Sequence, residues 1–351
     1  MTERVIDLRS DTLSMPTDEM LKAIQTAPMG DDSRDGDPTV LELEALVAEM
    51  FGKEAAMLTA SGSMSNIVAM RTHAEPGATA IVEESAHLYG AEFSGIAAVC
   101  GLLVVTVPGH MGAMDPDALR ARVIKAGTGF PARAMVCLEN THNGAGGAVI
   151  SPEHTDLCCE IAHEAGLPVH LDGARIFNAA VALGVDVQEL TRSVDSVTVC
   201  LSKGLSAPVG AVLAGSNEFI DRARNIRRAL GGNMRQAGII AAPGLIALRS
   251  LVDRMAEDHA NARFLAEEIA GIEGLRIDLD SAQSNMAYVD VSGLGIDSTT
   301  FAEHLHDRGA RGLPIGSVNI RFVAYRGITR ADVERAAIII RETVAARPWD
   351  A

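Results

Sequence analysis

Three short polar segments each follow an apolar run, and their residue types could do chemistry together. His142 follows the first run, Asp172 and Arg175 follow the second, and Lys203 follows the third. An ammonium group that emerges from an apolar strand is costly to bury unless it is neutralised or used. A Schiff base between Lys203 and an aldehyde cofactor would do both. A lysine stem that simply lies on apolar surface explains this residue equally well when it is taken alone.

A carboxylate near such a lysine suits one aldehyde cofactor in particular, pyridoxal 5′-phosphate (PLP). PLP acts as an electron sink when its pyridine nitrogen is protonated, and a neighbouring carboxylate keeps the proton there. Asp172 ends one predicted strand and Lys203 follows the next, with room between them for a crossover helix predicted over 177–190. Asp172 with Gly173 is also a common turn pair, so the prediction depends on both strand ends together.

A phosphate group needs its own binding site, and residues 60–66 are the candidate. Small residues here, including Gly62 and Ser63, lead from an apolar run into a helical pattern. Free backbone N–H groups at a helix start bind anions well. A serine N-cap with a glycine turn is the plain alternative, and the segment matches no dinucleotide or Walker fingerprint.

The elements that must position these residues alternate between strands and helices. Short apolar runs predict buried strands at 80–82, 102–107, 134–138, 168–171 and 197–201. A capping residue followed by proline predicts helices that begin at Asp37, Asp115 and Ser151. The alternation predicts an α/β fold, with a mostly parallel sheet covered by helices on both faces. Ligands of such sheets bind outside the carboxyl ends of the strands, where the polar segments lie.

The pattern changes near Leu245. A charged helix is predicted over 248–269, short strands over 287–291 and 318–323, and a last helix from Thr329. We therefore predict a PLP-binding large domain with an N-terminal arm at 1–247. A smaller α+β domain is predicted at 248–351.

Composition excludes several classes of function. The net charge of −16 disfavours nucleic acid as a partner. No run is long and apolar enough for a membrane span, and the N-terminus has no signal pattern, so a cytoplasmic location is expected. The 5 cysteines show no zinc spacing, so buried free thiols and no metal site are predicted.

Taken together, these segments resemble the low-specificity L-threonine aldolase family of PLP enzymes, which has the aspartate aminotransferase-like fold (fold type I). The resemblance covers nearly the whole chain. It is carried by motifs at residues 7–12, 30–32, 37–40, 61–66, 138–143, 170–179, 200–205 and 234–238.

The resemblance implies a role for each matching residue. Lys203 would carry the Schiff base, Asp172 would contact the pyridine nitrogen, and His87 would stack on the ring. Other cofactor contacts would come from Gly62, Ser63, Arg175, Ser202 and Arg235. The substrate carboxylate would be held by Ser10, Arg175 and Arg321. Either His87 or His142 would deprotonate the substrate hydroxyl, and Arg235 would reach the cofactor site, from a neighbouring subunit of a homotetramer with active sites at subunit interfaces.

The resemblance also implies a reaction, the cleavage of L-threonine, L-allo-threonine or a related β-hydroxy-α-amino acid to glycine and an aldehyde. A PLP-dependent β-elimination on the same scaffold is the nearest alternative. A catalytically silent binding protein is an alternative of another class, which the joint presence of Lys203, Asp172, Arg175 and His142 disfavours.

Three departures from the family pattern bear on the substrate. Ser33-Arg34-Asp35 replaces Val-Tyr-Gly, Asn233 replaces a glycine, and Ala324-Tyr325 replaces Thr-His. Because Arg34 stands in place of the family tyrosine, we expect it to favour a substrate with a second acidic group, such as 3-hydroxyaspartate. An ordinary surface arginine paired with a neighbouring aspartate is the alternative.

Overall fold

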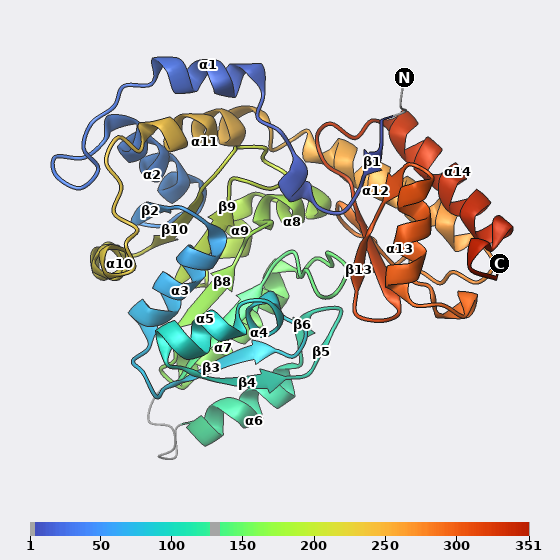
Figure 1. Ribbon diagram of the computed structural model, residues 1–351. Helices are drawn as coiled ribbons and strands as arrows, with labels where there is room; N and C mark the ends of the chain where they lie inside the picture. The colour runs from blue at the N-terminus through green and yellow to red at the C-terminus, as the bar shows by residue number, and fades with distance from the viewer. Residues whose placement is uncertain (1–3, 127–133, 351) are drawn as a thin grey trace. The chain divides into compact units, whose positions relative to one another are not determined.

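The computed structural model describes residues 4–126 and 134–350, and the chain divides into two compact units (Figure 1). The larger unit comprises Pro16–Ala145 and Val149–Val252, and the smaller comprises Met1–Met15, Gly146–Ala148 and Asp253–Ala351. The N-terminal segment Met1–Met15 was expected in the large domain. It belongs to the smaller unit because β1 (Ile6–Asp7) pairs in parallel with β12 (Ala310–Arg311). The functional division at 247/248 stays a prediction.

A seven-stranded sheet forms the centre of the larger unit. Its strands lie in the order β2-β10-β9-β8-β7-β3-β4. Their bounds are Ala55–Thr59, Ala211–Gly215, Ser196–Cys200, Val169–Asp172, Ala134–Glu139, Thr79–Glu83 and Leu103–Val107. Only β10 runs antiparallel to its neighbours β2 and β9, so the sheet is mostly parallel, as predicted.

Strand register brings the polar strand ends to one edge. Glu139 at the end of β7 pairs with Asp172 at the end of β8. Asp172 in turn pairs with Thr198 of β9, which ends at Cys200 just before Lys203. The residues predicted from separate segments therefore lie at the same carboxyl edge.

Helices cover both faces of this sheet (Figure 1). The first layer packs on the sheet through an apolar cluster that includes Met57 and Leu213, and consists of α3 (Gly62–His73) and α10 (Asn217–Ala229). The other layer includes α2 (Pro38–Met50), α7 (Pro152–Glu164), α8 (Ile176–Leu183) and α9 (Val187–Thr191). As expected, Asp37 and Ser151 cap α2 and α7 through their side chains.

One predicted helix is wrong in its extent. The crossover segment 177–190 forms two helices, because Gly184 adopts a left-handed conformation with φ of 67° and ends α8. The remaining helices of the larger unit include α1 (Asp18–Thr26), α6 (Pro116–Ala126) and α11 (Gly238–Ser250).

The smaller unit has an α+β arrangement. Its antiparallel sheet has the order β11-β14-β13, with bounds Met286–Asp290, Asn319–Val323 and Leu313–Ile315. Its long helices are α12 (Met255–Ala270), α13 (Ser298–Asp307) and α14 (Arg330–Ala346). The helix predicted over 248–269 begins later, at Met255, because α11 continues to Ser250. Thr329 and Asp332 form a capping box at the start of α14.

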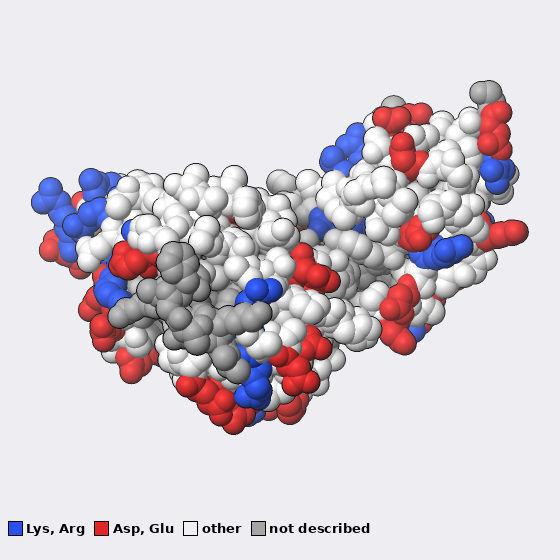
Figure 2. Space-filling model, turned by 90° about the horizontal axis from the view of Figure 1, so that it is seen from below, with Lys and Arg blue, Asp and Glu red and all other residues white. Residues whose placement is uncertain are grey.

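The surface charges and the burial of the cysteines agree with the expectations from the composition. Figure 2 shows acidic and basic side chains interspersed over the visible face. All 5 cysteines are buried and free. Within 4–126 and 134–350, every helix is too short or too polar to cross a bilayer.

Candidate active site

Asp172 ends β8 in the larger unit, and Lys203 lies in the turn that follows the end of the neighbouring strand β9. The Asp172 side chain is buried, with 2% exposure. Its Oδ1 accepts a hydrogen bond from the Ala174 N–H at 3.1 Å, and its Oδ2 accepts one from Asn66 Nδ2 at 2.9 Å. Lys203 is half-buried, and its carbonyl accepts the N–H of Ser206, a residue held at φ of 62°. Such a left-handed serine is a strained backbone position in the turn that follows Lys203.

The start of α3 lies against the end of β9. Ser61 caps the helix by accepting the Met64 N–H, and Gly62 is its first residue. A Cβ at Gly62 would meet Cys200 Sγ at 2.5 Å, so only glycine fits this close approach. The N–H groups of a 12-residue helix thus open beside the strand that leads to Lys203. This is the arrangement that an anion-binding helix start requires.

These residues fit PLP. The cofactor needs an amine for its aldehyde, a carboxylate for its pyridine nitrogen and an N–H-rich site for its phosphate. Lys203, Asp172 and the start of α3 supply these three groups within the larger unit.

Glu92 belongs to the same cluster and escaped the sequence analysis. It is buried, and it accepts hydrogen bonds from Ser63 Oγ at 2.6 Å and from Asn66 Nδ2 at 3.2 Å. Burial and the negative charge of Asp172 raise the pKa of Glu92. The only sequence signal for it was a charged residue within the mostly apolar stretch after His87.

The two candidate histidines differ in their surroundings. His142 is fully buried, with Nε2 at 3.1 Å from Glu83 Oε2 and at 3.7 Å from Glu139 Oε2. Its Nδ1 accepts the Ala145 N–H at 3.2 Å. Although burial opposes it, the charges of Glu139 and Glu83 raise the pKa of His142. Both ring nitrogens of His142 therefore face groups of the protein itself.

His87 is more accessible. Its side chain keeps 32% of its exposure, and Nδ1 lies 3.5 Å from Glu92 Oε1. Its backbone N–H donates to Glu139 Oε2 at 2.6 Å. Glu139 thus holds the backbone of His87 and Glu92 holds its ring, while the side chain stays partly exposed.

Two of the remaining predicted residues lie near the strand ends. Arg175 is buried at the start of α8, and its Nη1 is 3.5 Å from Asn143 Oδ1. Ser202 is half-buried beside Lys203. An arginine fork in this position suits a planar carboxylate.

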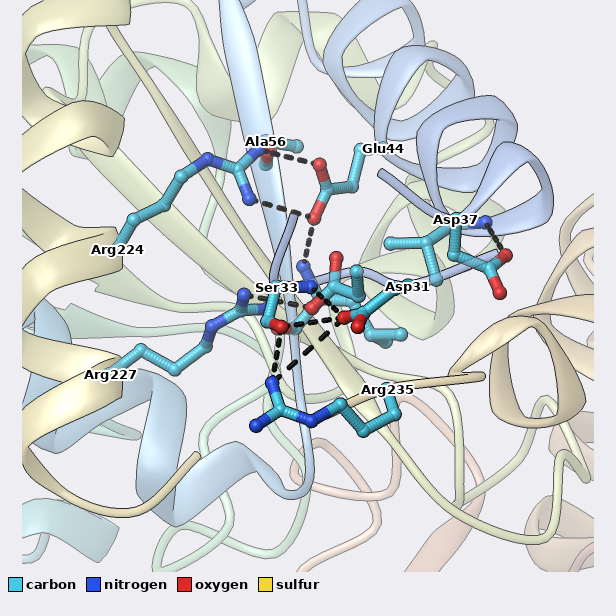
Figure 3. A network of polar contacts seen from close by, with 11 residues as sticks. Asp31, Ser33, Asp37, Glu44, Ala56, Arg224, Arg227 and Arg235 are labelled. Carbon is cyan, nitrogen blue, oxygen red and sulfur yellow. Dashed lines mark hydrogen bonds and ion pairs between the residues drawn. The ribbon is translucent and has the colours of Figure 1, made fainter. Parts of the chain in front are cut away.

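Arg34 and Arg235 instead lie on the surface of the larger unit, and Figure 3 shows Arg235 beside Ser33 and Asp31. The Arg34 side chain is 79% exposed, with Nε at 3.5 Å from Asp31 Oδ2. Arg235 is 62% exposed, donates to Ser33 Oγ and lies 3.9 Å from Asp31 Oδ1. Within the described chain, both arginines are thus engaged with the loop 31–36.

The same loop is anchored below by buried charges (Figure 3). Arg227 donates to Asp32 Oδ2 at 2.9 Å and to the Leu58 carbonyl at 2.7 Å, and its side chain is only 3% exposed. Arg224 pairs with Glu44 at 2.6 Å, and Glu44 accepts the Leu58 N–H. The base of the loop is therefore tied to the edge strand β2.

Ser10 and Arg321 lie in the smaller unit. Ser10 Oγ accepts the Thr12 N–H at 3.2 Å. Arg321 is buried, and its Nη2 donates to the Arg9 carbonyl at 3.1 Å. Tyr325, one of the departures from the family pattern, donates its hydroxyl to the Asp7 carbonyl at 2.9 Å. These bonds give each residue a structural part in its own unit, and their contact with a substrate stays a prediction.

Comparison with known proteins agrees with this geometry. The family model described as "Beta-eliminating lyase" matches residues 7–292. Low-specificity L-threonine aldolase 1 of Arabidopsis thaliana is 39% identical over 338 residues, which cover 95% of this chain and 94% of the relative. The low specificity L-threonine aldolase of Escherichia coli K12 is 38% identical over 336 residues, which cover 95% and 97%.

Solved structures share the fold at lower identity. Leishmania major threonine aldolase has a TM-score of 0.81 at 17% identity, covering 97% of this chain and 99% of that chain. A putative L-allo-threonine aldolase of Listeria monocytogenes has a TM-score of 0.78 at 20% identity, covering 97% and 96%. With its PLP fold type I architecture and these close sequence relatives, the chain belongs to the low-specificity L-threonine aldolases within the beta-eliminating lyase family.

Proposed function

We propose that this protein is a PLP-dependent aldolase that cleaves L-threonine, L-allo-threonine or a related β-hydroxy-α-amino acid to glycine and an aldehyde. The observation that supports it most is the placement of Asp172 at the end of β8 and of Lys203 just after the end of β9, beside the start of α3. The activity named for its relatives fits this placement.

The cofactor would supply an electron sink for the electrons left at Cα when the Cα–Cβ bond breaks. Lys203 would hold it covalently through its Nζ. Asp172, which accepts two N–H groups, would face the pyridine nitrogen. Gly62 and Ser63 would bind the phosphate, and Ser202 and Arg235 are proposed as further cofactor contacts.

Removal of the β-hydroxyl proton needs a base, for which the geometry favours His87. Its ring is half-exposed, whereas both nitrogens of His142 face groups of the protein. His142 would then act on the site by fixing Glu83 and Glu139, of which Glu139 holds the His87 backbone. In this proposal His87 carries both the stacking and the proton transfer.

The substrate carboxylate would be bound by Arg175, together with Ser10 and Arg321. Guanidinium groups bind carboxylates through two parallel hydrogen bonds. We further propose that Arg34 favours substrates with a second acidic group, because its side chain is 79% exposed and its exposed ion pair with Asp31 is weak enough to be exchanged for a substrate carboxylate. A cytoplasmic homotetramer, as in the family pattern, completes the proposal.

Product analysis separates this reaction from β-elimination, which the name of the matching family model keeps as the second candidate. The PLP-reconstituted protein is incubated with L-threonine and, separately, with L-serine. We expect glycine and an aldehyde from L-threonine. Formation of a 2-oxo acid and ammonia in place of glycine would establish elimination instead.

A further inference from the structure

Behind Asp172, a chain of hydrogen bonds runs through the larger unit. It links His73 to Ser196 at 2.7 Å, Ser196 to His170 at 2.8 Å, His170 to Asn66 at 3.1 Å and Asn66 to Asp172 at 2.9 Å. The members from Ser196 to Asp172 are at most 2% exposed. Buried polar networks that are fully bonded specify one arrangement of their groups.

Local structure explains why these residues meet. Asn66 and His73 are two turns apart on α3, so they share the helix face that packs on the sheet. His170 and Asp172 alternate on β8 and so point to the same face of the sheet. Ser196 pairs with His170 in the parallel register of β8 and β9. One helix and two strands therefore position every residue of this series of hydrogen bonds.

The direction of the bonds follows from the two ends of Asn66. Its Nδ2 lies 2.9 Å from Asp172 Oδ2 and 3.2 Å from Glu92 Oε2. An ionised carboxylate only accepts hydrogen bonds, so the amide nitrogen faces these oxygens and the amide oxygen faces His170. His170 Nε2 must therefore donate to Asn66 Oδ1.

The donor and the acceptor of each remaining hydrogen bond then follow. Burial lowers the pKa of His170 to about 4, so the ring is neutral near pH 7 and carries its one proton on Nε2. Nδ1 must accept from the Ser196 hydroxyl, whose oxygen accepts in turn from His73 Nε2. Burial also lowers the pKa of His73, to about 3, and its ring stacks on Phe219 with centroids 4.4 Å apart. All four bonds point toward Asp172.

We propose that His73, Ser196, His170 and Asn66 form a one-directional relay that holds the Asp172 carboxylate oriented toward the pyridine nitrogen of PLP. Hydrogen bonds aligned in one direction polarise each other, so each donor strengthens the next. The relay opposes the repulsion between Asp172 and the nearby Glu92. The four members are positioning residues, because they act through Asp172. The proposal rests on the proposed function, which supplies the cofactor.

The first test needs no cofactor. ¹⁵N–¹H correlation spectra of the imidazoles in the apo-protein report which ring nitrogen carries the proton. We expect the Nε2–H tautomer for both His170 and His73, with no protonation down to about pH 6. A proton on Nδ1 of His170 would break the direction of the chain and overturn the relay, while leaving the proposed reaction intact.

The second test measures PLP binding by the apo-protein. We expect the dissociation constant to rise about tenfold in Asn66→Ala, roughly fivefold in His170→Phe and about twofold in His73→Phe, since the effect weakens with distance from Asp172. With PLP labelled by ¹⁵N in the ring, the pyridine resonance of His170→Phe should move toward that of unprotonated pyridine.

A matched control separates positioning from packing. His259 in the smaller unit is another histidine whose pKa burial lowers to about 4, so His259→Phe carries a similar loss without touching the relay. If His170→Phe binds PLP with the affinity and ring resonance of His259→Phe, the relay is overturned. If the wild-type protein fails to bind PLP, the proposed function itself fails. Should His170→Phe not fold, the tautomers of the wild-type protein still decide.

Discussion

The strand-end cluster around Asp172 and the loop 31–36 differ in how far their charged side chains are buried and hydrogen-bonded. Asp172 is buried and accepts two N–H groups, and its partner Asn66 is in turn hydrogen-bonded to His170. At the loop, Arg34 and Arg235 are mostly exposed to solvent, whereas the side chain of Asp32 is buried and pairs with Arg227. The first region matches the family pattern, whereas the second departs from it at residues 33–35.

The two regions therefore tolerate different kinds of substitution. A buried carboxylate with several donors loses much free energy if one partner is altered, so the groups that hold the cofactor are fixed together. An exposed loop residue contributes little to folding, so its side chain can change and alter substrate preference instead.

The largest effect is expected below the loop, where Arg227 and Asp32 form a buried pair. Arg227→Ala should lower the free energy of unfolding by about 3–5 kcal/mol, because it leaves Asp32 buried without its cation. Urea unfolding measures this. The exposed Arg249–Glu42 pair is the control, and Arg249→Ala should cost about 1 kcal/mol or less. An equal decrease in the free energy of unfolding in both variants would contradict the difference between the buried and the exposed pair.

Asp172→Asn should come next, with its effect on catalysis. The amide cannot stabilise a proton on the pyridine nitrogen, so kcat for L-threonine cleavage should fall by about 10²–10³-fold. Steady-state kinetics with saturating PLP measures this. Asp186→Asn is the control, because an asparagine caps α9 as well as the aspartate does and should leave kcat unchanged.

Arg34→Ala should act selectively and more weakly. If Arg34 contacts a second acidic group, kcat/KM for 3-hydroxyaspartate should fall by about fivefold, and kcat/KM for L-threonine by less than about twofold, as for an exposed charge pair. Comparing the two substrates in wild type and variant gives the answer. An equal loss on both would make Arg34 an ordinary surface residue.

The smallest effect concerns the pH dependence of folding through His142. Its raised folded-state pKa means that its contribution to stability is complete below the unfolded value of about 6.5 and is lost as pH rises through the folded value. The free energy of unfolding of the wild-type protein should therefore fall above about pH 6.5, and this slope should be smaller in His142→Phe. His110→Phe, at an exposed position, should keep the wild-type slope.

Much of the fold could be predicted because its signals are local. Proline after a capping residue marked α2 and α7, and β-branched runs marked β3, β7, β8 and β9. Strand order is not local, so the antiparallel β10 between β2 and β9 was not foreseen. The break between α8 and α9 depends on one glycine conformation, which helical periodicity does not report.

For the site, residues with unusual chemistry for their context could be predicted, and residues that act through neighbours could not. Lys203 and Asp172 stood out because they end apolar strands. Asn66, His170 and Glu92 look like ordinary polar residues in the sequence. The packing of α3 against β8 brings Asn66 and His170 together beside Asp172, and Glu92 joins them from the segment before α5. Their partners are set by tertiary structure, which the single sequence does not contain.

The reaction proposed for this protein is a PLP-dependent retro-aldol cleavage that depends on Lys203. The most direct measurement follows glycine and acetaldehyde together when the PLP-reconstituted protein is incubated with L-threonine, in wild type and in Lys203→Ala. We predict equimolar formation of both products by the wild type and none by the variant. Undiminished product formation by Lys203→Ala, or an absence of glycine from the wild type, would contradict the account.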